Sequence, residues 1–126
     1  HVFEVLFGYM LLALKLKENK DLNGQAFNFG PGKSSSLTVK NLLDIIKEHF
    51  SNFDWKISKS KNFFESKLLK LNSQKSNKVL GWKNYLGYNK KIEFLTEWYK
   101  CYYKNPKHCI LLSERQLVKF ENLIKK

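Results

Sequence analysis

The stretch "VFEVLFGYMLLALKLK", residues 2–17, decides how this chain folds. Its apolar side chains fall on nearly every face of a helix, so a helix here must pack on more than one side. The run is shorter than the ~20 apolar residues that span a bilayer, and Glu4, Lys15 and Lys17 interrupt or bracket it. We therefore expect a core helix of a soluble protein, with further chain covering the faces that a small domain leaves open.

The segments that follow predict shorter helices and three strands. We expect helices that begin at Thr38, at Asn72 or Ser73, at Asn89, and at a capping box formed by Ser113 and Gln116, with Gly81 and Pro106 as stops. Short apolar runs predict strands at Ala26–Phe29, Trp55–Ile57 and Leu68–Leu71. The length of 126 residues suits one domain. The pattern as a whole predicts an α/β fold.

The charge of the chain is strongly basic, at +12 from 23 Lys and Arg against 11 Asp and Glu. Arg115 is the only arginine, however, and the lysines are scattered through every segment. Arginine is the residue best suited to bidentate contacts with phosphates and bases. We therefore favour a solvated basic surface, with no nucleic acid and no membrane as partner. A small basic module that binds nucleic acid remains the alternative.

The two cysteines, Cys101 and Cys109, do not form a disulfide framework in a chain of this length. Free thiols are normal in a reducing compartment, so we expect a cytoplasmic protein. The histidines and cysteines lack the spacing of a zinc site, and we expect no bound metal.

Two short motifs imitate catalytic or cofactor-binding sequences. Gly32-Lys33-Ser34 resembles the end of a phosphate-binding loop, but Phe27 stands where the first glycine of that loop is needed. Tyr103 and Lys107 have the spacing of a Tyr-x-x-x-Lys pair, but Pro106 would break the helical turn between them. We interpret the first motif as a turn and the second as a chance match.

Six stretches follow one another in the order "HVFEVLFGYMLLALKL", "FNFGP", "SLTVKNLLDII", "LLKLNSQKSNKVLGW", "KIEFLTEWYKCYY" and "LSERQLVKF". Together they resemble the C-terminal third of the extended short-chain dehydrogenases, within the sugar-nucleotide 4,6-dehydratases. The CDP-glucose dehydratases are the most similar branch, and the dTDP-glucose and GDP-mannose dehydratases are the alternatives. The likeness covers nearly the whole chain.

This resemblance implies that the chain is the helix-rich, substrate-binding C-terminal part of an α/β enzyme, with a few short strands and most of the Rossmann core missing. Residues 1–37 would border the missing cofactor domain, and residues 38–126 would form the substrate lobe. Asn28-Phe29-Gly30-Pro31 would be the turn that the family carries at the end of a late strand. Lys33 and Ser34 would then be incidental loop residues.

The activity that the resemblance implies is NAD-dependent loss of water from a nucleotide-linked hexose. The glycine-rich NAD loop, the catalytic Tyr/Lys pair and the catalytic carboxylates all belong to the preceding part of family members. This chain would therefore carry no catalytic and no cofactor-binding residue, and would be inactive alone. The whole enzyme would be a homodimer acting on a nucleotide sugar.

The same resemblance gives three candidate substrate contacts. Glu65 keeps the acid of a His-acid pair that family members often have, and Phe64 replaces its histidine. Glu65 would contact hydroxyl groups of the sugar or base, or be an exposed loop carboxylate. Phe64 would stack on the base or cover the core of the lobe. His1 matches the end of the family's upstream loop and would be the third contact, and we interpret Glu4 as a helix-start residue rather than a ligand contact.

Overall fold

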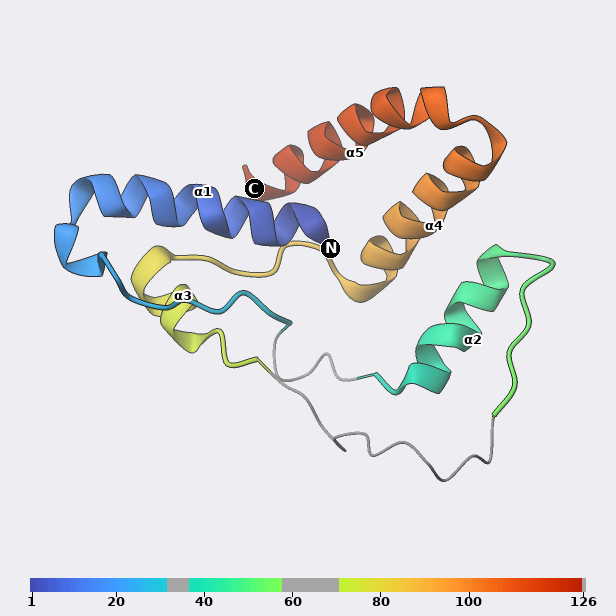
Figure 1. Ribbon diagram of the computed structural model, residues 1–126, viewed down its shortest axis with the longest axis horizontal. Coiled ribbons are helices and arrows are strands. Elements are labelled where there is room, and N and C mark those ends of the chain that lie inside the picture. Colours follow the sequence, from blue (N-terminus) through green and yellow to red (C-terminus); the bar gives the residue numbers. More distant parts are fainter. Residues whose placement is uncertain (32–36, 58–70, 126) are drawn as a thin grey trace.

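The computed structural model describes residues 1–31, 37–57 and 71–125. Every regular element within these ranges is helical (Figure 1). The α-helices are α1 (Val2–Glu18), α2 (Val39–His49), α3 (Gln74–Leu80), α4 (Tyr88–Lys104) and α5 (Cys109–Ile124), and two short 3₁₀ helices are η1 (Lys20–Leu22) and η2 (Pro106–His108). The α/β prediction is therefore wrong for the described part of the chain.

The expected strand at Ala26–Phe29 shows why no sheet forms there. The segment is not helical, but its main-chain oxygens accept hydrogen bonds from side chains of α3 instead of from a neighbouring strand. Lys75 Nζ donates to the oxygen of Ala26 at 3.0 Å, and Ser76 Oγ donates to that of Asn28. A strand requires ladder partners for its main-chain groups, and side chains have taken that role.

The other two strand predictions have different outcomes. Residues 55–57 form no ladder with any described residue, so the strand expected at Trp55–Ile57 is also wrong. Residues 68–70 of the third expected strand lie outside the described residues, and Leu71 belongs to no regular element.

The helix expected over residues 2–17 is confirmed as α1, and it packs against two hydrophobic clusters. The first cluster is built on Leu22, Leu80 and Trp82, and the second on Leu86, Phe94 and Phe120. Phe7 packs against both clusters. Gly8 allows the close approach, because a Cβ atom there would lie 2.5 Å from the ring of Phe29. Helix α1 thus joins the two halves of the core.

The α4–α5 hairpin departs from the predicted boundaries. Helix α4 begins after Gly87, two residues earlier than an Asn89 cap requires. The capping box at Ser113 is wrong, because α5 begins at Cys109. Asn105 caps η2 by accepting from the N–H of Lys107, so the chain is helical before it reaches Ser113. Ser113 instead accepts a hydrogen bond from Trp98 Nε1 at 3.1 Å and joins the two helices.

The predicted start of α2 and the predicted end of α3 are confirmed. Thr38 caps α2 by accepting from the N–H of Asn41. Gly81 ends α3 in the left-handed conformation, with φ at 70°. Helix α2 lies beside α4 and apart from α1, α3 and α5 (Figure 1), and it has no buried residue.

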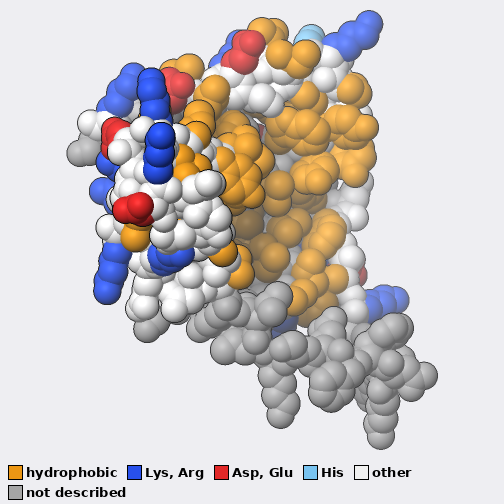
Figure 2. Space-filling view, turned by 60° about the vertical axis from the view of Figure 1, so that its left-hand side comes forward, with side chains coloured by type: hydrophobic (Ala, Val, Ile, Leu, Met, Phe, Trp, Pro, Cys, Tyr) orange, Lys and Arg blue, Asp and Glu red, His pale blue; other side chains and the backbone are white. Residues whose placement is uncertain are grey.

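Large apolar side chains remain exposed along α1 and α5. Figure 2 shows hydrophobic side chains gathered over much of one face of the molecule. On α1 the exposed residues are Val2, Leu6, Tyr9, Met10 and Leu14. None of the helices in the described ranges is long and apolar enough to cross a membrane.

Candidate functional site

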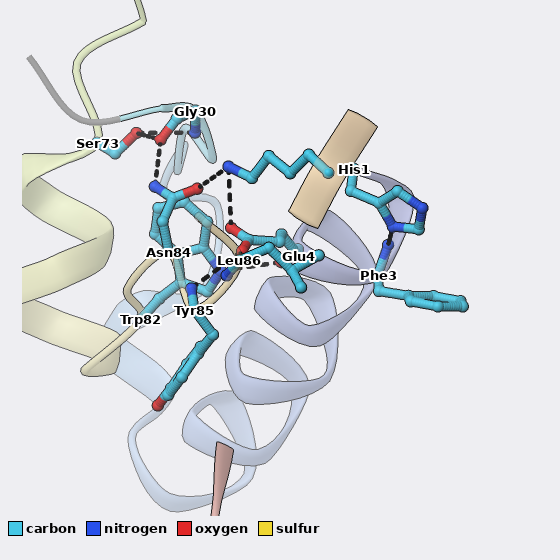
Figure 3. Close-up of polar contacts among 10 residues, drawn as sticks. His1, Phe3, Glu4, Gly30, Ser73, Trp82, Asn84, Tyr85 and Leu86 are labelled. Carbon is cyan, nitrogen blue, oxygen red and sulfur yellow. Dashed lines mark hydrogen bonds and ion pairs between the residues drawn. The ribbon is translucent and has the colours of Figure 1, made fainter. Parts of the chain in front are cut away.

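Glu4, in the first turn of α1, is a buried acid that contacts several distant parts of the chain (Figure 3). Its side chain is 2% exposed, and its Oε1 accepts from the main-chain N–H groups of Tyr85, at 2.9 Å, and Leu86, at 2.6 Å. Its main-chain oxygen accepts from Trp82 Nε1 at 2.9 Å. One residue therefore fastens the start of α1 to the segment between α3 and α4. The expectation that Glu4 is a helix-start residue is correct, but it understates this role.

The second oxygen of the Glu4 carboxylate, Oε2, is buried and has no hydrogen-bond partner among the described residues. The nearest cation is Lys91 of α4, whose Nζ lies 3.8 Å away. A buried carboxylate oxygen that is paired only by a lysine at this distance stays poorly compensated. The carboxylate is therefore held mainly by the two N–H donors.

Lys91 connects Glu4 with the turn at Gly30 through Asn84. Its Nζ also donates to Asn84 Oδ1 at 3.0 Å, and Asn84 Nδ2 donates to the oxygen of Gly30 at 3.0 Å. Ser73 closes the network, since its Oγ accepts from the N–H of Gly30 at 2.8 Å and donates to its oxygen at 3.2 Å (Figure 3). We call Glu4, Lys91, Asn84, Gly30 and Ser73 the polar relay. The relay connects the start of α1 to the turn at Gly30.

His1 lies at the N-terminal end of α1, where it acts as the helix cap. Its Nδ1 accepts from the N–H of Phe3 at 3.4 Å, and its ring meets Phe3 and Phe94 edge-on at centroid distances of 4.8 and 5.6 Å. The ring is half-buried. The imidazole is therefore held by Phe3 and Phe94, and its contact with substrate stays a prediction.

Phe64 and Glu65 lie outside the described residues, as does the Gly32-Lys33-Ser34 motif. Tyr103 and Lys107 are separated as predicted, because α4 ends at Lys104 and Pro106 begins η2. Neither residue is therefore part of a helical Tyr-x-x-x-Lys pair.

Sequence reasoning missed Ser73, Asn84 and Lys91 as members of one network. Ser73 was identified only as a possible cap, yet its side chain caps nothing in α3. The main-chain groups of Gly30 need hydrogen-bond partners, and Ser73 and Asn84 supply them from far along the chain. No short-range sequence pattern links these residues. The one clue was Glu4, an acid within an otherwise apolar run.

Open grooves run along α1 and α4, and the described residues form no metal centre. A groove of about 790 Å³ lies between the end of α2 and α4, and its aromatic lining comes from Phe50, Phe53, Tyr99 and Tyr103. An apolar groove of about 630 Å³ lies between α1 and α5. No group of three or more His, Cys, Asp or Glu side chains that could hold a metal ion occurs in the described ranges.

Comparison with known proteins gives one informative match. No model of a known protein family matches the chain, and no solved structure does. The likeness is to a dehydratase. The chain is 25% identical over 118 residues to the CDP-glucose 4,6-dehydratase of Salmonella typhimurium. The match covers 93% of this chain but only 33% of that enzyme, so the chain spans about one third of the length of its curated relative.

Proposed function

We propose that the chain is the substrate-binding portion of an NAD-dependent sugar-nucleotide 4,6-dehydratase, with CDP-glucose as its substrate and CDP-4-keto-6-deoxyglucose as its product. The observation that carries the proposal is the similarity to CDP-glucose 4,6-dehydratase, which extends over nearly the whole chain. A match spread over several helices and the turns between them is hard to attribute to one shared motif.

The polar relay supports this proposal. It fixes the first turn of α1, which follows the proposed substrate contact His1, to the turn at Gly30. A site that must be accurate to within a fraction of an ångström needs rigid supports of this kind. In this function the relay positions the binding surface and takes no part in bond breaking.

NAD does not fit the residues that the structure describes. A dinucleotide site needs a glycine-rich turn between a strand and a helix, with the pyrophosphate on the helix N-terminus. The described ranges contain no strand, and the turn at Gly30 is followed by undescribed residues and then by α2. When bound to a complete enzyme, NAD would supply hydride transfer. The residues of this chain would bind and orient the nucleotide sugar.

A chimera tests the proposed function. The stretch of the Salmonella enzyme that matches this chain is replaced by residues 1–126, and turnover of CDP-glucose is measured against the enzyme without that stretch. We expect the chimera to form the 4-keto product and the truncated enzyme to form none. Parallel assays with dTDP-glucose and GDP-mannose identify the base. A chimera that folds and binds NAD but converts none of the three substrates would contradict the proposal.

A second candidate function is binding of single-stranded nucleic acid, and the groove between α2 and α4 favours it. Tyr99 and Tyr103 lie 6.3 Å apart between ring centroids in near-parallel orientation, and Lys100 lies over the ring of Phe50. Stacked aromatic rings beside lysines are the usual platform for unpaired bases. Fluorescence anisotropy of a labelled single-stranded oligonucleotide tests this function. Binding to nucleic acid should weaken steeply as the salt concentration rises, because counterions compete for the phosphates.

A further inference from the structure

Asn23 and Gly24 form the only Asn-Gly pair in the chain, and they directly follow η1. Both residues are exposed, and Asn23 is the residue that caps the end of η1. Gly24 has a φ of 73°, and a Cβ atom placed on it would meet nothing within 4 Å. A glycine in open space leaves the adjoining peptide group accessible, and its torsions are little restricted. The pair therefore has room for a reaction between its own groups.

The reacting groups of this pair are not engaged elsewhere in the described part of the chain. Within residues 1–31, 37–57 and 71–125, the Asn23 carboxamide has no hydrogen-bond partner, and the N–H of Gly24 donates to no main-chain oxygen. Other asparagines differ, since Oδ1 of Asn19 accepts from a main-chain N–H at 2.9 Å and Oδ1 of Asn72 accepts from another at 3.0 Å. Asn23 thus combines exposure, an unengaged side chain and a following glycine.

We propose that Asn23 is a deamidation site, at which the main-chain nitrogen of Gly24 attacks the side-chain carbonyl carbon of Asn23. Asparagine is one of the thermolabile residues of proteins, and a following glycine presents no side chain to block the attack. The only co-reactant is water. The inference is independent of the dehydratase proposal, because it uses none of the residues of the polar relay.

The reaction proceeds in two steps and transfers no electrons. The Gly24 nitrogen bonds to Cγ of Asn23, the Cγ–Nδ2 bond breaks, and the departing nitrogen takes up the proton from Gly24 and leaves as ammonia. The product is a five-membered succinimide ring. Water then opens the ring at one of its two carbonyl carbons. One opening gives aspartate, and the other gives isoaspartate, whose main chain runs through Cγ and is one CH₂ group longer.

The turn around Asn23 controls how quickly this ring closes. The ψ of Asn23 is 135° in the folded chain, and ring closure requires a rotation, because it brings Cβ and the attacking nitrogen close to eclipsed across the Cα–C bond. The N–H groups of Asn23 and Gln25 oppose this rotation by donating to main-chain oxygens of η1 at 3.0 and 3.1 Å. Asn19 supports the same turn as the cap of η1. Loosening of η1 should therefore speed the reaction.

Isoaspartate would lengthen a link whose two ends are anchored in the core. Leu22 belongs to the first core cluster, and Phe27, on the other side of the Asn-Gly pair, packs against the same cluster. An extra main-chain CH₂ group between them changes the spacing that both side chains need. The aspartate product carries the same new charge on an unchanged main chain. The isoaspartate form should therefore melt at a lower temperature than Asn23→Asp.

Incubation of the 126-residue chain in mildly alkaline buffer, followed by digestion at acidic pH and mass spectrometry, tests the proposal. We expect the peptide that contains Asn23 to gain the mass difference between an oxygen atom and an NH group several-fold faster than the peptide that contains Asn72. A protein isoaspartyl methyltransferase should label the aged peptide. Asn23→Gln should abolish the change, because its longer side chain closes a less favourable six-membered ring. Asn72→Gln is the matched control and should leave the rate at Asn23 unchanged.

The control by η1 is tested with Asn19→Ala, which we expect to raise the rate at Asn23 several-fold while circular dichroism shows that the chain stays folded. Where that variant fails to fold, dilute urea acting on the parent replaces it. A rate at Asn23 no higher than that at Asn72 would overturn the proposal, as would loss of ammonia that yields aspartate without isoaspartate. An unchanged rate in Asn19→Ala, or in dilute urea, would overturn the control by the turn.

Discussion

The indole N–H of Trp82 donates to the main-chain oxygen of Glu4 at 2.9 Å, across 78 positions of sequence. Trp82 is only 1% exposed, and its ring meets that of Phe29 edge-on at 5.3 Å between centroids. The residue therefore fills the first core cluster and fixes the first turn of α1 at the same time. Loss of its polar and apolar contacts can be measured separately.

Trp82→Phe should destabilise the chain, because it keeps most of the buried ring but leaves the oxygen of Glu4 without this donor. The loss should be about 0.5–1.5 kcal/mol, the net contribution of one hydrogen bond, because this oxygen keeps its donor within α1. Trp82→Ala should cost more, about 3–5 kcal/mol, because it also leaves a cavity. Urea denaturation followed by circular dichroism measures both. Equal stabilities of Trp82→Phe and the parent would show that the hydrogen bond contributes nothing.

Gly30→Ala should destabilise the chain by about 1–3 kcal/mol through overpacking. A Cβ atom at residue 30 would lie 2.8 Å from the Cβ of Leu71. The clash should persist in Gly30→Ala/Leu71→Ala, because alanine keeps the Cβ atom that collides. Thermal unfolding of the parent, the two single variants and the double variant measures this. If Leu71→Ala fully restored the stability lost in Gly30→Ala, the clash would come only from the outer atoms of the leucine side chain. Lys33→Ala, in the same loop, should leave the melting temperature unchanged.

Asp54 should titrate below its ordinary range. A hydrogen bond from Lys47 Nζ at 3.0 Å is the main reason that the pKa of the Asp54 carboxyl is lowered, and a main-chain hydrogen bond from Trp55 lowers it further. A carboxyl whose pKa is lower in the folded state stabilises that state above its unfolded pKa, and this contribution is lost as the pH falls through the folded pKa. NMR titration of the carboxyl carbon measures the value.

The control for this titration is Lys47→Met, in which the pKa of Asp54 should rise toward that of an ordinary aspartate. Because both side chains are exposed, the ion pair should be screened by salt. A pKa that is the same in Lys47→Met and in the parent would contradict the assignment.

The apolar groove between α1 and α5 should make the isolated chain self-associate despite its charge of +12. Leu6, Tyr9 and Met10 of α1 are each about half exposed along this groove, and exposed apolar patches favour association. Sedimentation velocity should show concentration-dependent species, and a hydrophobic dye should bind. The double variant Leu6→Lys/Met10→Lys should reduce both effects. A monodisperse parent without dye binding would contradict this prediction.

The sequence predicted the helices well, because their signals are local. Thr38 caps α2 and Gly81 ends α3 as their residue types require. The strands failed because a strand depends on a distant partner, and here Ser76 and Lys75 satisfied the main chain instead. The predicted helix start at Ser113 is wrong, because Asn105 caps η2 and α5 follows directly from Cys109.

The candidate site was predicted only in part for a similar reason. Glu4 was expected to begin a helix, but the contacts of its side chain and main-chain oxygen come from residues 82–86 and 91. Nothing in the sequence near Glu4 specifies those partners. A buried acid inside an apolar helix indicates that partners are needed, but not which residues supply them.

The distance in sequence between Glu4 and Leu86 also determines when the fold can form during synthesis. The N–H group that Glu4 accepts from most closely is made 82 positions later. At the usual pace of translation, the apolar face of α1 waits roughly 4–16 s for these partners. Throughout that interval Phe7, Leu11 and Leu16, which pack against the core in the folded chain, are open to solvent or to a chaperone. Slow codons before residue 86 would lengthen this exposure, and we expect expression of the chain to depend on chaperone supply.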